Sequence, residues 1–354
     1  MTAPPVGSPP VPTTVDELLD PAWLTAALGT RFPGVAITKV VPGPITERVS
    51  TNVRFTVESS STLPAELPAA LCAKGYFSEA GRSTAGVGEV EARFYGELAP
   101  ACAVRTLRSV YADVDPESRH SIVISTDVVA EGGRFLDALS PFTADQVAAS
   151  LEQYATLHAS TWHDERWAGC VWLRPQRESF MVARGLPDIE DNFSGPNGSG
   201  VPLAVRDGQR LLDAYAALVA VPTAAPGWPV VHGDAHIGNL FLDGDRRPCL
   251  IDWQMVSHGP WGLDVGYHIA SALRVAERER TERDLLRHYL DQIRARGVEP
   301  PAWDEAWEEY RRGIVYGFFL WGITRYVAPA IIAELLHRLG TAVCAHGSFA
   351  ALGV

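Results

Sequence analysis

Lysine is nearly absent from this chain of 354 residues, in which Lys39 and Lys74 are the two lysines among 30 basic residues. Against so strong a preference for arginine, a lysine at an unusual position indicates a role that arginine cannot fill. Basic residues are also fewer than acidic ones: 30 basic against 42 acidic residues give a formal net charge of −12. This balance argues against non-specific binding to nucleic acids or anionic membranes.

Long apolar runs and paired cysteines are missing as well. The longest strongly apolar run, Ile314–Ile323, is far shorter than the ~20 residues that a bilayer requires, so we expect no membrane span. The five cysteines are scattered and never form Cys-x-x-Cys, a pattern typical of reduced thiols in a cytoplasmic protein. Residues 1–13 are uncharged and proline-rich, without the basic and apolar regions of a signal peptide, and we expect a disordered tail there.

The chain length predicts about two domains at ~150 residues each. Apolar alternation, helical periodicity and turn residues then give the order strand, strand, strand, helix, strand, strand, followed by a mostly helical remainder. The expected segments are strands at 36–41, 49–57, 69–77, 104–111 and 121–129, with a helix at 83–98. Gly132-Gly133 marks the expected boundary, so we predict a first lobe at 14–130 and a second at 131–354.

The most informative stretch is 230–264, VVHGDAHIGNLFLDGDRRPCLIDWQMVSHGPWGLD. An apolar strand leads into Asp234, Asn239 follows five positions later, and Asp252 stands at the end of a second apolar strand. The turn residues Asp243-Gly244-Asp245 predict a hairpin. Such a hairpin brings the loop before one strand near the loop after the other, so the three polar residues are expected to converge.

This set suits phosphoryl transfer. Asp234 is the candidate base for an attacking hydroxyl, and Asn239 and Asp252 supply hard oxygen ligands for Mg²⁺. The spacing matches that between the catalytic and metal-binding loops of protein kinases. A metal-hydrolase site built on His232, Asp234 and His236 is an alternative, but it leaves Asn239 and Asp252 unexplained.

With these residues, HGDAHIGNLF followed by LIDWQ resembles the aminoglycoside phosphotransferase and choline kinase superfamily, most of all its ecdysteroid-kinase-like branch. The resemblance covers roughly residues 35–273. It implies an α+β, protein-kinase-like bilobal fold, with an antiparallel sheet and one helix in the first lobe and a larger, mostly helical second lobe. It further implies ATP and Mg²⁺ as cofactors and a small-molecule hydroxyl as acceptor. A catalytically silent nucleotide-binding protein with a kinase fold is the rival interpretation.

A kinase requires a lysine on the third strand and a glutamate on the following helix. Lys74 lies in the third apolar stretch, where an ammonium is costly unless it is paired. At 100° per residue, Val87, Val90, Phe94, Tyr95 and Leu98 share one helical face, with Glu91 at its centre. A carboxylate on a core-facing stripe requires a cation, so we predict a Lys74–Glu91 pair at the nucleotide phosphates.

Four weaker predictions complete the site. Ser50, Thr51 and Asn52 follow the expected first strand and are candidates to donate hydrogen bonds to phosphate; an ordinary hairpin turn is the alternative. Backbone groups near Thr126 and Val128 are candidate adenine partners. His232 is expected to pack within the catalytic loop, and Asp264, by resemblance, to support its backbone. The aromatic stretch 316–321 is either core or the wall of an acceptor pocket. The sequence leaves open the acceptor, the choice between ATP and GTP, the oligomeric state and the role of Lys39.

Overall fold

The computed structural model describes residues 8–82, 85–175, 177–220 and 227–354. The chain divides into two compact units. Unit 1 contains the N-terminal part up to Cys102 together with Thr106–Arg134 and Asp252–Met255; unit 2 contains Ala103–Arg105, Phe135–Ile251 and Val256–Val354. The domain boundaries expected from the sequence stay a prediction.

Two short helices open unit 1, and both begin where the sequence predicts. The side chain of Thr14 accepts a hydrogen bond from the Glu17 backbone at the start of α1 (Val15–Leu18), and Glu17 completes the capping box. Asp20 caps α2 (Pro21–Gly29) by accepting from the Ala22 N–H. These caps satisfy N–H groups that the first helical turn leaves unpaired.

The segment before α1 differs in part from the expected disordered tail. Residues 1–7 lie outside the described residues, but Trp23 Nε1 donates to the Pro10 carbonyl at 2.7 Å. Val11 is buried in the core of the unit, and His120 Nε2 donates to the Pro12 carbonyl at 2.9 Å. These apolar and backbone contacts order residues 10–12 against the unit.

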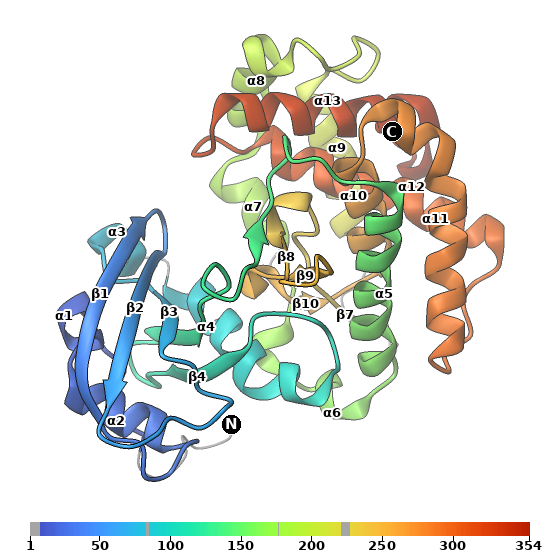
Figure 1. Cartoon of the computed structure of the whole chain (residues 1–354). Helices are drawn as coiled ribbons and strands as arrows, with labels where there is room; N and C mark the ends of the chain where they lie inside the picture. Colours follow the sequence, from blue (N-terminus) through green and yellow to red (C-terminus); the bar gives the residue numbers. More distant parts are fainter. Residues whose placement is uncertain (1–7, 83–84, 176, 221–226) are drawn as a thin grey trace. The chain divides into compact units, whose positions relative to one another are not determined.

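A five-stranded antiparallel sheet forms the centre of unit 1, with the order β1-β2-β3-β5-β4 (Figure 1). The described strands are β1 (Ile37–Glu47), β2 (Thr51–Ser59), β3 (Ala70–Gly75), β4 (Ser109–Val114) and β5 (Ser121–Thr126). Side chains of β2 alternate, so Val53, Phe55 and Val57 enter the core. Asn52 lies on the opposite face, paired in register with Lys74 of β3.

The helix after β3 is less regular than predicted. It consists of α3 (Glu79–Arg82), α4 (Ala85–Arg93) and a π-helical turn (Phe94–Leu98), followed by a 3₁₀ turn (Ala99–Ala101); Ser83, the expected start, lies outside the described residues. Val90, Phe94, Tyr95 and Leu98 are buried as expected, whereas Val87 is exposed. Val87 belongs to the first turn of α4, so the buried stripe begins only at its second turn.

The short turn Trp253–Met255 also belongs to unit 1. The indole of Trp253 stacks on the Phe94 ring with centroids 3.7 Å apart, and its Nε1 donates to Thr106 Oγ1 at 2.9 Å. Trp253 is fully buried. This aromatic anchor fixes the neighbouring Asp252 within unit 1.

Unit 2 is mostly helical. Its helices and strands are α5 (Ala144–Thr161), α6 (Glu165–Ala168), α7 (Arg177–Ala183), α8 (Gly185–Ser194), α9 (Gly208–Val219), β7 (Val230–Val231), β8 (Leu240–Leu242), β9 (Pro248–Leu250), β10 (Ser257–His258), α10 (Gly262–Ala272), α11 (Val275–Ala295), α12 (Trp303–Gly322) and α13 (Pro329–His346). β6 (Arg134–Phe135) joins the two units in sequence and lies beside β8. Short 3₁₀ turns at Val171–Leu173, Pro196–Gly198, Ile237–Asn239 and Ala350–Leu352 complete the unit.

Two features of unit 2 position its polar residues. β8 and β9 form the predicted antiparallel hairpin, with Leu240 opposite Leu250. α10 and α12 cross very closely, because a Cβ at Gly313 would collide with the Gly262 carbonyl oxygen. The α+β architecture thus agrees with the prediction of an antiparallel sheet followed by a helical part. In the described part of the chain, no helix is both long and apolar enough to span a membrane.

Candidate phosphotransfer site

Lys74 is the centre of a charged cluster in unit 1. Its Nζ lies 2.6 Å from Glu91 Oε2 and 2.8 Å from Asp252 Oδ1. Only 18% of the Lys74 side chain is exposed. Burial alone would lower the pKa of Lys74, but the carboxylates of Asp252 and Glu91 outweigh it and raise this pKa well above its ordinary value. The ammonium is therefore charged at every physiological pH.

Glu91 joins Lys74 to the turn that follows Asp252. Its carboxylate is buried at the centre of the α4 stripe and accepts from the backbone N–H of Trp253 as well as from Lys74. Burial raises the pKa of Glu91, and the Lys74 ammonium and this N–H offset part of the rise. The two contacts hold α4, β3 and the Asp252 turn together.

Asp252 has an uncommon backbone conformation, with a φ of 66°. Side chains other than glycine rarely adopt this left-handed region, although aspartate tolerates it better than most. Such strained positions concentrate at functional sites. The conformation, the ion pair with Lys74 and the Trp253 anchor all fix the direction of this carboxylate.

Lys39, the other lysine, has a simpler environment. Its Nζ contacts Glu58 Oε1 at 2.6 Å, and both side chains are more than half exposed. The two residues are directly paired between β1 and β2. Exposed pairs of this kind contribute about 0–1 kcal/mol, so Lys39 is a surface residue of the sheet.

The loop after β7 in unit 2 is held by a buried carboxylate. Asp264 Oδ2 accepts from the His232 N–H at 2.7 Å and lies 3.0 Å from His158 Nε2, while Oδ1 accepts from the Gly233 N–H at 2.9 Å. Burial opposes ionisation of Asp264, but the contacts with His158, His232 and Gly233 lower its pKa below the ordinary value. Asp264 therefore supports the backbone that leads into Asp234.

His232 connects this loop to β9. Its Nε2 lies 2.8 Å from the Ile251 carbonyl, and its Nδ1 lies 3.2 Å from the backbone nitrogen of Asp234. A carbonyl can only accept and a backbone N–H can only donate, so the ring carries its proton on Nε2. His232 is thus a buried bridge within the loop.

Asp234 and Asn239 are in direct contact. Asn239 Nδ2 donates to the Asp234 carbonyl at 2.8 Å and to Asp234 Oδ2 at 2.9 Å. His236 Nε2 lies 3.7 Å from the same carboxylate oxygen. The contact fixes the Asp234 side chain and directs the Asn239 amide nitrogen toward it.

Asn239 and Asp252 each offer an oxygen of a kind that suits a divalent cation. The amide nitrogen of Asn239 faces Asp234, so its Oδ1 is the atom left to ligate, and Asp252 supplies a carboxylate. Both are hard oxygen donors of the kind that Mg²⁺ prefers. Asn239 belongs to unit 2 and Asp252 to unit 1. Within the described ranges, no three His, Cys, Asp or Glu side chains gather as a metal-binding group.

The three candidate phosphate donors differ in position. Asn52 is paired with Lys74 and lies on the same face of the sheet, and Ser50 lies in the turn before β2. The side chain of Thr51 points to the other face, where it is fully buried and its hydroxyl has no hydrogen-bond partner within the described structure. The Thr51 hydroxyl thus faces away from Lys74, because neighbouring strand residues face opposite sides. The phosphate contact of Thr51 stays a prediction.

The segment after β5 has part of its backbone already paired. The Thr126 N–H donates to the Arg108 carbonyl at 3.0 Å, and the Val128 carbonyl accepts from Gly133 at 2.8 Å. The hydroxyl of Thr126 donates to Glu131 Oε2 at 2.9 Å. The Thr126 carbonyl also accepts from the Ser125 hydroxyl at 3.1 Å. The adenine prediction therefore depends on the second lone pair of that carbonyl and on the Val128 N–H.

A contact of Asp234 with Tyr267, and one of Tyr267 with Trp321, were not predicted from the sequence. Tyr267 of α10 donates to Asp234 Oδ1 at 3.3 Å, and Trp321 of α12 donates through Nε1 to the Tyr267 hydroxyl at 2.6 Å. The aromatic stretch of α12 is otherwise largely core, with Tyr316 and Phe319 buried. The only sequence signal was that Tyr267 follows Asp264 by three residues and so lies near it on the helix.

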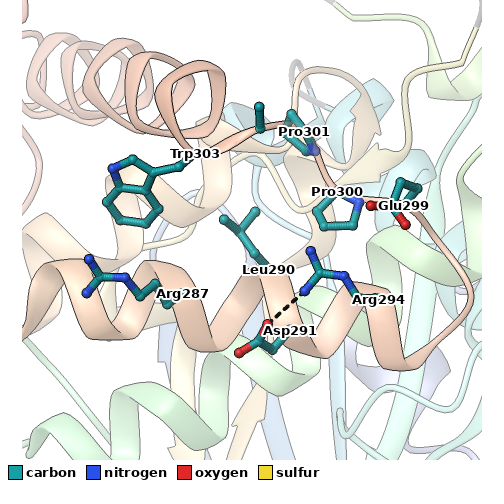
Figure 2. A pocket seen from close by; sticks show the side chains of 9 residues that line it. Arg287, Leu290, Asp291, Arg294, Glu299, Pro300, Pro301 and Trp303 are labelled. Carbon is teal, nitrogen blue, oxygen red and sulfur yellow. Dashed lines mark hydrogen bonds and ion pairs between the residues drawn. The ribbon is translucent and has the colours of Figure 1, made fainter.

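A cavity of about 460 Å³ lies elsewhere in unit 2 (Figure 2). It is lined by residues of α11 and α12 and by the loop that joins them, including Arg287, Leu290, Arg294 and Trp303. The Arg287 guanidinium lies 4.6 Å from the Trp303 ring centroid, and Arg294 is paired with Asp291. None of the predicted site residues lines this cavity.

One segment of the chain is similar to a known family of enzymes. Residues 133–306 match the profile of the phosphotransferase enzyme family, which includes the loop of Asp234. The match covers just under half of the chain. The segment also contains Asn239, Asp252 and Asp264. No curated protein sequence matches the chain.

Solved structures of phosphotransferases have a similar fold. The microcompartment-associated aminopropanol kinase shares 13% identity, with 89% of this chain and 94% of that chain covered and a TM-score of 0.50. Two others are the macrolide 2′-phosphotransferase from Brachybacterium faecium (16% identity, 96% and 98% covered, TM-score 0.49) and a choline/ethanolamine kinase family protein from Mesorhizobium loti (16%, 88% and 92%, 0.45). The chain thus has the protein-kinase-like fold predicted from the resemblance. The profile match to residues 133–306 agrees with the predicted superfamily, and the ecdysteroid-kinase-like branch stays a prediction.

Proposed function

We propose that this protein transfers the γ-phosphate of ATP to a hydroxyl group of a small molecule, with Mg²⁺ as cofactor. The observation that carries the proposal is the position of Lys74, whose ammonium contacts both Glu91 and Asp252 in a largely buried environment. A buried ammonium held by two carboxylates suits the binding of nucleotide phosphates next to a metal ligand. The match of residues 133–306 to the phosphotransferase enzyme family supports the same reaction class.

Unit 1 supplies the nucleotide-binding residues in this proposal. Lys74 contributes a compact positive charge to the phosphates, and Glu91 holds it in place. Asn52 and Ser50 add donors on the Lys74 side. The Thr126 carbonyl and the Val128 N–H take the edge of the adenine base, a pairing that needs one acceptor and one donor.

Unit 2 supplies the base. The acceptor oxygen attacks the γ-phosphorus, the bond from that phosphorus to the β–γ bridging oxygen breaks, and ADP leaves with the electron pair. The proton of the acceptor hydroxyl passes to the carboxylate of Asp234, which Asn239 orients. Asn239 and Asp252 are the residues that would hold Mg²⁺, and the bound ion would neutralise charge on the phosphate oxygens.

A screen for ADP release over hydroxyl-bearing metabolites and antibiotics, with Mg·ATP as donor, tests the proposal and identifies the acceptor. The expected result is release that depends on one acceptor class and on Asp234. Binding of Mg·ATP without turnover on any acceptor would instead support a catalytically silent nucleotide-binding protein. Elemental analysis of the purified protein adds an independent check, since tightly bound zinc would favour the metal-hydrolase interpretation.

A further inference from the structure

Both oxygens of the Asp234 carboxylate accept hydrogen bonds within unit 2. Oδ2 accepts from Asn239 Nδ2, and Oδ1 accepts from the hydroxyl of Tyr267. The base of the proposed reaction is therefore held from two sides, one by a residue of the catalytic motif and one by a residue outside it. The second contact forms only when the hydroxyl hydrogen of Tyr267 points toward Asp234 Oδ1.

Trp321 fixes that direction. Its indole N–H can only donate, and it lies 2.6 Å from the Tyr267 oxygen, so it occupies an acceptor position of that oxygen. The hydrogen of Tyr267 must then point elsewhere, and Asp234 Oδ1 is the acceptor within reach. The order of donation runs from Trp321 to Tyr267 and from Tyr267 to Asp234.

The Tyr267 ring has no room to turn away. It is fully buried, and a Cβ at Gly317 of α12 would lie 2.2 Å from the ring, so the ring lies against the helix backbone. Tyr316 contacts it edge-on, with centroids 6.2 Å apart. Burial, together with the Asp234 carboxylate, raises the pKa of Tyr267 well above its ordinary value, so the phenol keeps its proton.

We propose that Tyr267, locked by Trp321, is a positioning residue that holds Asp234 Oδ1 in the direction needed to take the acceptor proton. The inference rests on the proposed function. The hydrogen bond from Tyr267 orients and stabilises the Asp234 carboxylate. Loss of such a bond to a charged group is expected to lower the rate of a base-assisted step about 10- to 100-fold. Nucleotide binding depends on unit 1 in our proposal and is not affected by Tyr267.

Steady-state ADP release from Mg·ATP tests this role, with water as acceptor or with the acceptor found in the screen. Tyr267→Phe is expected to lower kcat about 10- to 100-fold and to change the KM for ATP less than about twofold. Trp321→Phe keeps an aromatic ring but removes the N–H, and we expect a smaller fall in kcat in the same direction. Tyr215→Phe is the matched control, because its buried hydroxyl donates to the Arg177 carbonyl and not to Asp234.

The outcomes separate this inference from the proposed function. The proposed function, and the inference with it, is overturned if Asp234→Asn releases ADP at the full rate. It is also overturned if the wild-type protein is inactive with water and with every acceptor. An inactive Asp234→Asn together with a Tyr267→Phe whose kcat stays within twofold of wild type overturns the inference alone. A fall in kcat that is equal in Tyr215→Phe and Tyr267→Phe also overturns it. If Tyr267→Phe fails to fold by circular dichroism, Trp321→Phe decides in its place.

Discussion

Replacing Asp264 by asparagine is expected to destabilise unit 2 strongly. The native carboxylate is completely buried and takes hydrogen bonds from His232, Gly233 and the ring of His158 at 2.7, 2.9 and 3.0 Å. Asparagine has one acceptor oxygen and one donor nitrogen, so at least one of these donors would face another donor. Breaking a buried charged network in this way costs about 3–5 kcal/mol.

Thermal unfolding measures this cost. For a unit of this size, each kcal/mol corresponds to about 2–4 °C in Tm, so Asp264→Asn should lower Tm by at least ~6 °C. Asp284→Asn is the matched control, because its carboxylate is exposed and pairs with Arg287 on the surface; we expect a change of less than ~0.5 kcal/mol. An Asp264→Asn protein whose Tm lies within ~1 °C of wild type would refute the reasoning.

The effect should also depend on pH with a definite sign. The pKa of Asp264 is lowered in the folded state, so its ionised form contributes stability above the unfolded value of about 3.9. That contribution is lost as the pH falls through the lower folded-state value. The difference in Tm between wild type and Asp264→Asn is therefore expected to shrink at the acid end of a series from pH 7 to pH 3. A difference that stays constant would show that Asp264 does not act through its charge.

Three further predictions follow from the residues of unit 1. Lys74→Met should weaken binding of Mg·ATP at least tenfold by calorimetry, whereas Lys39→Met, the same change at the other lysine, should leave it within twofold; equal effects would contradict the assignment. Thr51→Val should leave ATP affinity unchanged and keep or slightly raise Tm, because the Thr51 hydroxyl is buried without a described partner. Trp253→Ala should lower Tm by several degrees, because loss of the stack on Phe94 costs about 3–5 kcal/mol for a buried aromatic. It should also weaken Mg·ATP binding, because Asp252 is then no longer held in place. Unchanged nucleotide affinity would show that Trp253 does not position Asp252 for nucleotide binding.

Local patterns were sufficient for much of the fold and for part of the site. The capping box at Thr14 and the stripe around Glu91 depend on contacts within one or two helical turns, which sequence spacing encodes. The hairpin of β8 and β9 likewise follows from its turn residues. The Lys74–Glu91 ion pair and the Asp234–Asn239 contact lie within such predictable elements or next to them.

Other parts of the site depend on register and on distant contacts. Thr51 and Asn52 are neighbours in sequence but face opposite sides of β2, so a shift of one residue in register decides which of them lies beside Lys74. Trp321 reaches Tyr267 because α10 and α12 cross at glycines, and this crossing joins residues far apart in the chain. The grouping of Asp252 with unit 1 depends on the Trp253–Phe94 stack, which no local pattern indicates.

Asp234→Asn tests the central claim most directly. We expect this protein to bind Mg·ATP with an affinity close to wild type, because the nucleotide residues Lys74 and Glu91 are unchanged. We also expect it to lose phosphate transfer to the acceptor found in the screen, because asparagine cannot accept the hydroxyl proton. Transfer at the wild-type rate by Asp234→Asn would contradict the assignment of Asp234 as the base and, with it, the proposed reaction.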